Sequence, residues 1–571
     1  MSESASLVIR NGTIIDGSGA EPFAADLSVV GGKIQAIGAN LPRGAQEIDA
    51  RGKIVTPGFI DLHTHYDAQV TWSNRITPSS WNGVTTAMIG NCGVGFAPCL
   101  PHQRDMLVKL MEGVEDIPEV VLNEGLPWNW ESFEDYLGTL SEREYDLDVA
   151  TQVPHAALRV FVMGQRGADR EPATPEDCAK MAQLVAAGVR AGALGFSTSR
   201  TLNHQTKDGR AIPTLLAAED ELTAIAHALR GLGAGWMQVI SDFEDFDAEF
   251  GLLRRVAQCS TRPMSITILQ RDRDPEWWRT IMSQIGEANA QGTHIMGQVL
   301  TRPTGVLLGF EISQNPFLGR PSWAEIADLP LAQKIEILRR PDFRARLLGE
   351  TNPDAKLKAR VERWERIFVL GDPPNYEPAV EDSIACIAER KGRDAADLAY
   401  DMLLENGGKA ILYRPLSNYS YCNLDTVHDM IAHPDTLVGL GDGGAHVGVL
   451  CDASAFSFML THWTRDRTRG DRFALPWAIK RITSDNARAI GLGDRGLLRA
   501  GMKADINVID YDAMQLSHPE VAYDLPGGGR RLIQKTRGFD ATIVAGVPVY
   551  RDGESTGALP GRAIRGAQSA P

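Results

Sequence analysis

The sequence predicts an α/β protein in which a (β/α)8 TIM-like barrel is flanked by a β-sandwich and carries a long insertion. Eight extended apolar runs alternate with amphipathic helical stretches between residues 55 and 487, as in a parallel barrel. Short β-rich pieces occupy both ends, 1–54 and 488–571, and most simply complete one sandwich. The insertion, about 301–436, separates the seventh strand from the eighth.

The two β-rich ends are recognised by their turns. Asn11-Gly12 and Gly31-Gly32 separate short β-branched pieces near the start, which is typical of an antiparallel module. Similar pieces return near the end of the chain, at Ala504–Asp510 and Ala541–Tyr550. The tail after Gly553 is rich in Gly, Ala and Arg, and we expect it to wrap loosely or fray.

The barrel strands follow in order along the chain. One helix between them is well defined, because Thr174 is a good N-cap and Pro175 suits the first helical position. An insertion as long as 301–436 at the functional face of a barrel usually forms a lid or a substrate-selecting subdomain. The predicted strands are Ile54–His63, Val84–Cys92, Asp148–His155, Ala193–Thr198, Gly235–Ser241, Pro263–Leu269, His294–Leu300 and Leu437–Asp442.

The composition and net charge of the chain indicate which kinds of molecule it binds. A chain of 571 residues with 43% apolar content can bury a sizeable active site. Its net charge of −15 is dispersed, which argues against nucleic acid and anionic membranes and favours a small-molecule substrate. The sequence leaves assembly into a homo-oligomer open.

The cysteine pattern and the N-terminus indicate the compartment. Seven cysteines are scattered and form no Cys-X-X-Cys pair, which is typical of reduced thiols. Residues 1–6 lack a basic region followed by an apolar stretch, and no apolar run of the length of a membrane span occurs. We therefore expect a cytoplasmic protein.

Four residues at strand ends suggest a metal site. His63 and His65 are spaced i, i+2, so on a strand both project to one side, as two ligands of one ion must. Cys92 ends the second strand, and Asp442 ends the eighth between glycines that permit close approach of the backbone to a ligand. Taken singly, the histidines are explained equally well as local caps, the cysteine as a small buried hydrophobe and the aspartate as part of a turn.

In combination, these residues resemble the amidohydrolase superfamily, and most closely its N-acyl-D-amino-acid deacylase (D-aminoacylase) branch. The resemblance implies a barrel with a flanking β-sandwich, and zinc held by His63, His65, Cys92 and Asp442. The motifs that carry it are Ile14–Ser18, Val55–His65, Gly83–Gly93, His155–Arg159, Gly192–Thr198, Thr483–Gly496, Gly501–Asp510 and Gly557–Arg562.

The chain also departs from that branch. Such deacylases typically add one histidine after strand five and another after strand six, whereas Trp236–Asp242 and Met264–Gln270 contain none. Gln238, Asp242 or a distant group would have to substitute, so we expect at most one divalent ion, most simply zinc. Ser199–His204 also lacks the tyrosine that grips the substrate carboxylate in these deacylases, which argues against acyl-D-amino acids as substrates.

The sequence therefore predicts a metal-dependent amidohydrolase that cleaves an amide or other C–N bond through a metal-activated water. Asp442 is the expected acid–base residue, and His155, Arg200 and His446 are expected to bind substrate. The alternatives are a non-hydrolytic metal-assisted reaction on the same fold (C–C cleavage, decarboxylation or isomerisation) and a metal-free binding module. Structural or solvated positions are expected for His294, His428 and His433, and core positions for Trp236, Tyr419 and Tyr421.

Overall fold

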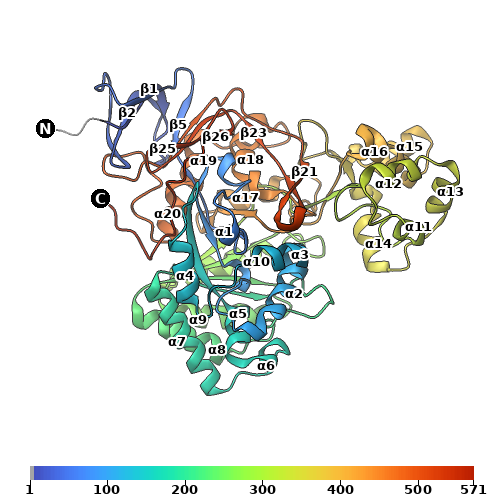
Figure 1. The fold of residues 1–571 in the computed structure, drawn as a ribbon, viewed down its shortest axis with the longest axis horizontal. Coiled ribbons are helices and arrows are strands. Elements are labelled where there is room, and N and C mark those ends of the chain that lie inside the picture. The colour runs from blue at the N-terminus through green and yellow to red at the C-terminus, as the bar shows by residue number, and fades with distance from the viewer. Residues whose placement is uncertain (1–4) are drawn as a thin grey trace.

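The computed structural model describes residues 5–571 and contains the predicted barrel (Figure 1). Eight parallel strands form one sheet, and the pairing of β7 with β18 joins its first and last strands, with Leu440 opposite His63. In spatial order the strands are β6 (Phe59–Asp61), β8 (Val84–Ile89), β9 (Asp148–Pro154), β10 (Gly195–Arg200), β11 (Trp236–Ser241), β12 (Met264–Thr267), β13 (Ile295–Gln298) and β17 (Thr436–Leu437), with β7 (His63–Thr64) and β18 (Leu440–Gly443) continuing the two ends.

The first predicted strand is split between two sheets. Residues 54–57 form β5 (Ile54–Pro57), which pairs with β1 and β19 of the flanking sheet, and only β6 and β7 belong to the barrel. Gly58 makes the crossing, where a Cβ would lie 2.1 Å from Thr85 Oγ1. A side chain cannot fit there, so the Pro-Gly step marks the boundary between the sheets.

Helices cover the outside of the barrel. The helix predicted after Thr174 is confirmed as α7, and the Thr174 hydroxyl accepts a hydrogen bond from the Asp177 N–H. The helices between and after the strands are α1 (Gln69–Trp72), α2 (Arg104–Glu115), α3 (Glu119–Gly125), α4 (Phe133–Ser141), α5 (His155–Met163), α6 (Gln165–Ala168), α7 (Pro175–Ala191), α8 (Glu219–Leu232), α9 (Phe246–Ser260), α10 (Trp277–Ala290), α17 (Asp425–Ala432), α18 (Ala455–Thr461), α19 (Leu475–Ile482) and α20 (Ser484–Ala489). None of the helices in the described chain is long and apolar enough to cross a lipid bilayer.

The flanking β-domain is built from both chain ends, as predicted. Its strands form one nine-stranded sheet around a separate apolar core that includes Leu27, Val55 and Ile506. The strands are β1 (Leu7–Ile14), β2 (Phe23–Val30), β3 (Lys33–Gly38), β4 (Gln46–Asp49), β5, β19 (Ile506–Ile509), β24 (Phe539–Val544), β25 (Val547–Arg551) and β26 (Glu554–Ser555). Residues 1–4, part of the segment from which we inferred that no export signal is present, lie outside the described residues.

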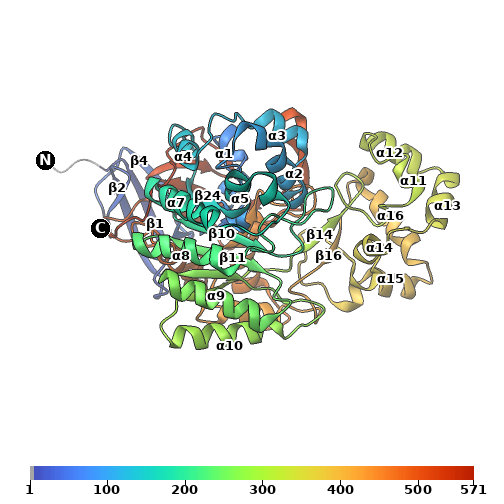
Figure 2. The ribbon, with the colours of Figure 1, turned by 90° about the horizontal axis from the view of Figure 1, so that it is seen from below.

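The insertion forms a lobe that stands to one side of the barrel (Figures 1 and 2). It has its own apolar core, which includes Phe310, Trp323 and Tyr400. A three-stranded sheet, β14 (Gly305–Leu308), β16 (Leu412–Pro415) and β15 (Phe368–Val369), connects it to the barrel. The lobe's helices are α11 (Pro321–Ala324), α12 (Leu331–Leu338), α13 (Pro341–Gly349), α14 (Ala355–Val361), α15 (Ile384–Lys391) and α16 (Ala395–Gly408).

The C-terminal segment is more ordered than its composition suggests, so the prediction of a loose tail was wrong. Backbone N–H groups of Ile564, Gly566 and Gln568 donate to carbonyl oxygens of Val149, Gly192 and Gly491, at 2.8, 2.8 and 2.9 Å. These bonds fix the tail under the start of the barrel. Two short ribbons precede it, β20 (Gln515–Leu516) with β23 (Thr536–Arg537), and β21 (Glu520–Leu525) with β22 (Gly529–Ile533).

Candidate metal centre and active site

His63 and His65 lie side by side at the end of the first barrel strand. Both are buried, and their ring centroids are 5.2 Å apart. His63 Nδ1 lies 3.0 Å from Gln298 Oε1, and His65 Nδ1 lies 3.0 Å from Glu115 Oε1. The acceptor at His63 Nδ1 favours the tautomer with its proton there, and at His65, whose Nδ1 makes no hydrogen bond among the described residues, the nearby charge of Glu115 favours the same tautomer, which leaves the Nε2 lone pairs free for a metal ion.

Cys92 lies in the turn after the second strand, with a backbone φ of +53°. Its Sγ is 3.2 Å from His63 Nε2, and its N–H donates to Gln238 Oε1 at 2.8 Å. The preceding Asn91 donates to the carbonyl oxygen of Thr64 at 3.1 Å and accepts a hydrogen bond from Gln152 at 2.8 Å. These buried bonds hold the turn in place, so the thiol faces the two imidazoles.

Asp442 brings a carboxylate to the same point from the last barrel strand. Its Oδ1 lies 3.7 Å from His63 Nε2 and 3.5 Å from His65 Nε2. The flanking glycines are required by close packing, since a Cβ at Gly441 would lie 2.2 Å from Asp61 Oδ2, and one at Gly443 would lie 2.5 Å from the Ser79 and Tyr66 hydroxyls.

These groups are spaced as the ligands of one ion. Donor atoms of His63, His65 and Cys92 all lie within 4.8 Å of one another, and Asp442 adds an oxygen beside both imidazoles. Ligands about 2.0–2.3 Å from a tetrahedral zinc ion are separated by roughly 3.3–3.8 Å. The two nitrogens and the sulfur therefore suit a single zinc ion or a similar divalent cation, and the Asp442 oxygen lies beside the two imidazoles but outside this group of mutually close atoms.

The charges of the neighbouring imidazole, thiol and carboxyl groups shift one another's pKa values. Burial opposes charge on His63, yet the Cys92 thiolate and Asp442 raise the pKa of this imidazole to about 9. Burial likewise opposes ionisation of Cys92, but His63 and His65 bring the pKa of its thiol below the usual value. Despite burial, the pKa of Asp442 is also below its usual range because of His65 and His63. A thiolate and a carboxylate are the forms that bind a cation.

A cavity of about 780 Å³ opens over the four groups. His446 and His204 line it, and His204 Nδ1 lies 2.9 Å from Ser199 Oγ. Burial, with His446 and His65 close by, lowers the pKa of His204 to about 3, so its ring is neutral near pH 7. The insertion contributes part of the wall, at Thr304, Val306, Gln314, Arg360, Leu416 and Ser417.

Comparison with known proteins identifies the family. The model of the amidohydrolase family matches residues 46–550, which is most of the chain. This protein belongs to the amidohydrolase family. With the converging ligand groups, membership makes it a metal-dependent hydrolase that acts on C–N bonds other than peptide bonds, and the predicted resemblance is confirmed.

Among curated proteins, this amidohydrolase is 26% identical to the D-aminoacylase of Alcaligenes xylosoxydans xylosoxydans, with 98% of this chain and 97% of that protein covered. It is 27% identical to the N-acyl-D-aspartate deacylase of the same organism, with 99% and 96% covered. An uncharacterized protein of Mycobacterium tuberculosis is also 27% identical, with 96% and 92% covered.

Solved structures share the fold. A D-aminoacylase whose binuclear metal centre was studied aligns with a TM-score of 0.65 at 21% identity, with 98% of this chain and 100% of that chain covered. The N-acyl-D-glutamate deacylase of Bordetella bronchiseptica, in complex with zinc and a phosphonate inhibitor, aligns with a TM-score of 0.65 at 23% identity, with 99% and 100% covered. These alignments confirm the barrel with its flanking β-domain.

Two of the residues predicted to bind substrate in this amidohydrolase contact other protein side chains and do not line the cavity. His155 is fully buried between Glu221 Oε1, 2.6 Å from its Nε2, and Thr198 Oγ1, 2.8 Å from its Nδ1. Arg200 pairs with Glu249, with 2.9 Å between Nη2 and Oε2. Neither lines the cavity, because each side chain is held by an acid on a neighbouring helix. Of the three residues predicted to bind substrate, only His446 lines it.

Three residues near the candidate metal centre were not predicted from the sequence: Glu115, Gln298 and His204. Gln298 ends strand seven, where the rule that functional groups follow strand ends applies, so its position was a usable signal. Glu115 ends α2, and no spacing in the sequence connects it with His65. Gln238, considered as a substitute ligand, instead accepts the Cys92 N–H, and Asp242 accepts hydrogen bonds from Thr201 and Leu202.

Proposed function

We propose that this amidohydrolase hydrolyses the amide bond of a small N-acylated substrate, using one divalent ion, most simply zinc, held by His63, His65, Cys92 and Asp442. The observation that carries the proposal is the cluster of His63, His65 and Cys92 under the large cavity, with the Asp442 carboxylate 3.7 and 3.5 Å from the two imidazoles. The names of the relatives, D-aminoacylase and N-acyl-D-aspartate deacylase, support an acylated amine as the substrate class.

Asp442 is the proposed acid–base residue. A divalent ion held here would polarise the scissile carbonyl and lower the pKa of water toward neutrality. Asp442 is ionised near pH 7, because the neighbouring imidazoles keep its pKa below the usual range. It can therefore accept a proton from the attacking water and then donate it to the leaving nitrogen. His446, four residues further along the chain, faces the same cavity and would contact the substrate.

Two arginines suggest that the substrate carries a negative charge. Arg360 and Arg271 line the cavity and are paired with neutral acceptors only, within the described chain: Arg360 Nη2 donates to Gln314 Oε1 at 2.7 Å, and Arg271 Nη2 donates to the Ser241 carbonyl at 3.0 Å. Arg271 is half-buried, and burial lowers the pKa of its guanidinium group, which is the cost of holding a cation without a counter-charge; Arg360 is exposed at the cavity wall. A carboxylate on the substrate would supply that charge.

The cytoplasm is the proposed compartment, because the seven cysteines are all free thiols in the described chain. No disulfide then depends on an oxidising environment.

A panel of amides tests the proposal. Protein loaded with zinc is incubated with N-acetyl-D-glutamate, with N-acetyl-β-alanine, an anionic amide that is not an acyl-D-amino acid, and with the uncharged N-acetylbenzylamine, and release of free amine is measured. We expect turnover of an anionic amide, and we expect Arg360→Gln to raise its KM by about tenfold or more with a smaller change in kcat. Arg346→Gln, an exposed arginine of the same lobe, is the matched control. Failure of every amide to release amine would refute amide hydrolysis, and equal turnover of the uncharged amide would refute the anion-binding role of Arg360.

A further inference from the structure

A second cavity, of about 540 Å³, lies at the beginnings of the barrel strands, and so at the end of the barrel opposite the metal centre. It opens where β11, β12 and β17 begin, with Trp236, Met264 and Leu437 in its wall. Elsewhere on this floor Ile564 of the C-terminal tail packs into the core cluster that contains Ile60. The cavity is therefore the part of the barrel floor that the tail does not fill.

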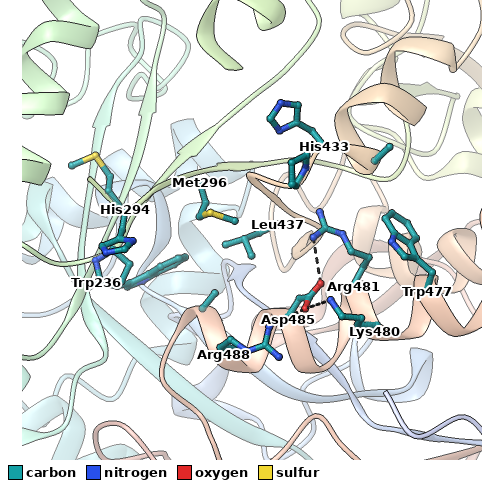
Figure 3. A pocket seen from close by; sticks show the side chains of 15 residues that line it. Trp236, His294, Met296, His433, Leu437, Trp477, Lys480, Arg481, Asp485 and Arg488 are labelled. Atoms are coloured by element: carbon teal, nitrogen blue, oxygen red, sulfur yellow. Dashed lines mark hydrogen bonds and ion pairs between the residues drawn. The ribbon is translucent and has the colours of Figure 1, made fainter. Parts of the chain in front are cut away.

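One side of this cavity is cationic. Lys480 and Arg481 of α19 and Arg488 of α20 surround a single carboxylate, that of Asp485, at 2.6, 3.3 and 3.3 Å (Figure 3). Two of the three positive charges are therefore not compensated within the group. On a chain with a net charge of −15, such a concave cationic wall is a local reversal that attracts anions.

The guanidinium group of Arg481 is buried, and one of its N–H groups makes no hydrogen bond among the described residues. It is only 7% exposed, and its Nη2 donates to the carbonyl oxygens of Ile431 and Thr436 at 3.2 and 2.6 Å. Its Nε–H has no partner among the described residues, and the Trp477 ring lies 5.4 Å from its guanidinium carbon. This N–H is too deeply buried for a ligand in the cavity to reach, so Arg481 contributes to the cavity wall through its positive charge, beside Lys480 and Arg488.

The opposite side of the cavity is apolar. Trp236 is 3% exposed, Met264 is fully buried, and the half-buried Met296 extends toward Leu437 (Figure 3). The volume matches that of pockets that bind small organic molecules, and an apolar wall opposite a few charged groups is the usual design of such pockets.

We propose that the floor cavity binds a small organic anion, with its carboxylate or phosphate group against Lys480, Arg481 and Arg488 and its apolar body against Trp236 and Met296. The proposal concerns a site separate from the metal centre and does not depend on the proposed reaction. His294 and His433, which also line the cavity, are further hydrogen-bonding groups at its edge.

Calorimetric titration of the full-length, zinc-loaded protein tests the proposal. Phenylacetate and phenyl phosphate distinguish the two head groups, benzylamine reverses the charge, and inorganic phosphate lacks the apolar body. We expect saturable one-to-one binding of at least one organic anion and at least about tenfold weaker binding of benzylamine and inorganic phosphate. No saturable binding of either organic anion, or equal binding of benzylamine, would overturn the proposal.

Variants locate the site. Lys480→Gln with Arg488→Gln should weaken anion binding by about tenfold or more, and Met296→Glu, which places a negative charge in the apolar wall, should do the same. The matched control, Arg51→Gln with Arg346→Gln, removes two exposed cations elsewhere and should leave the affinity unchanged. Thermal melts confirm that each variant is folded. Binding that survives both the double variant and Met296→Glu would place the anion at another site and refute the proposal.

Discussion

Glu115 Oε1 lies 3.0 Å from His65 Nδ1, with the glutamate 1% exposed. The two groups are not aligned for a hydrogen bond, but the negative charge of Glu115 favours a proton on Nδ1, which leaves the Nε2 lone pair free for the proposed metal ion. Glu115→Gln should therefore weaken zinc binding by about 10- to 100-fold. Zinc competition with a chromophoric chelator measures the effect, and Glu119→Gln, an exposed acid nearby, is the control. An unchanged zinc affinity would show that Glu115 does not orient His65.

His63 is predicted to be a direct ligand. His63→Ala removes one of the two imidazole nitrogens from the four-group set, and zinc affinity should fall by more than in Glu115→Gln. Metal content is measured by mass spectrometry after dialysis, beside His227→Ala, which changes an exposed histidine of α8. Equal zinc content in the two variants would place the ion elsewhere.

Asp442→Asn separates acid–base chemistry from architecture. The amide is nearly the same size as the carboxylate but cannot accept a proton, so kcat, compared with wild type at equal measured zinc content because Asp442 is also a proposed ligand, should fall by about 10²- to 10⁴-fold. The fold should persist, because Asp442 lies at the cavity and is not part of a structural ion pair with Arg or Lys. Circular dichroism checks the fold. Near-full activity would remove Asp442 from the proton-transfer role.

The barrel could be predicted from the sequence because its strands appear as local runs of apolar residues. Each of the eight predicted runs contains or overlaps a barrel strand, since a strand buried on both faces is a continuous apolar run. His63, His65 and Cys92 could be placed together because parallel strands end at one rim. The tail could not be predicted: its ordering comes from backbone hydrogen bonds such as Ile564 to Val149, which composition does not encode.

The contacts around the proposed metal ligands were harder to predict from the sequence. His65 and Glu115 are 50 positions apart, and His63 and Gln298 are 235 apart, so only the closed barrel brings them together. The expectation that His155 lines the site differs from the structure for a related reason. It follows a strand as the metal ligands do, but Glu221 on α8 holds its ring, and a sequence does not show which strand-end residues already have a buried partner.

The insertion is tied to the barrel side by a buried carboxylate. Glu377 accepts a hydrogen bond from His462 Nε2 at 2.9 Å and lies 3.1 Å from Arg467 Nη2, and its Oε1 also accepts the Leu424 N–H at 2.9 Å. Burial opposes its charge, but His462 and Arg467 lower the pKa of Glu377 to about 2. Removing the charge leaves the buried Arg467 with only the exposed carboxylate of Asp425 as an ionic partner, so Glu377→Gln should destabilise the protein by about 3 kcal/mol at pH 7.

The pH dependence of that loss has a defined sign. The pKa of Glu377 in the unfolded chain is near its ordinary value of 4.5, above the folded value of about 2. Its contribution is therefore complete above about pH 4.5 and is lost as the pH falls toward 2. Urea unfolding at several pH values should show the stability gap between wild type and Glu377→Gln constant from pH 7 to 5 and shrinking below pH 4.5. Asp425→Asn, which removes the exposed partner of Arg467, should change stability by less than about 1 kcal/mol. A gap that stays constant down to pH 3 would show that the carboxylate charge of Glu377 does not stabilise this junction.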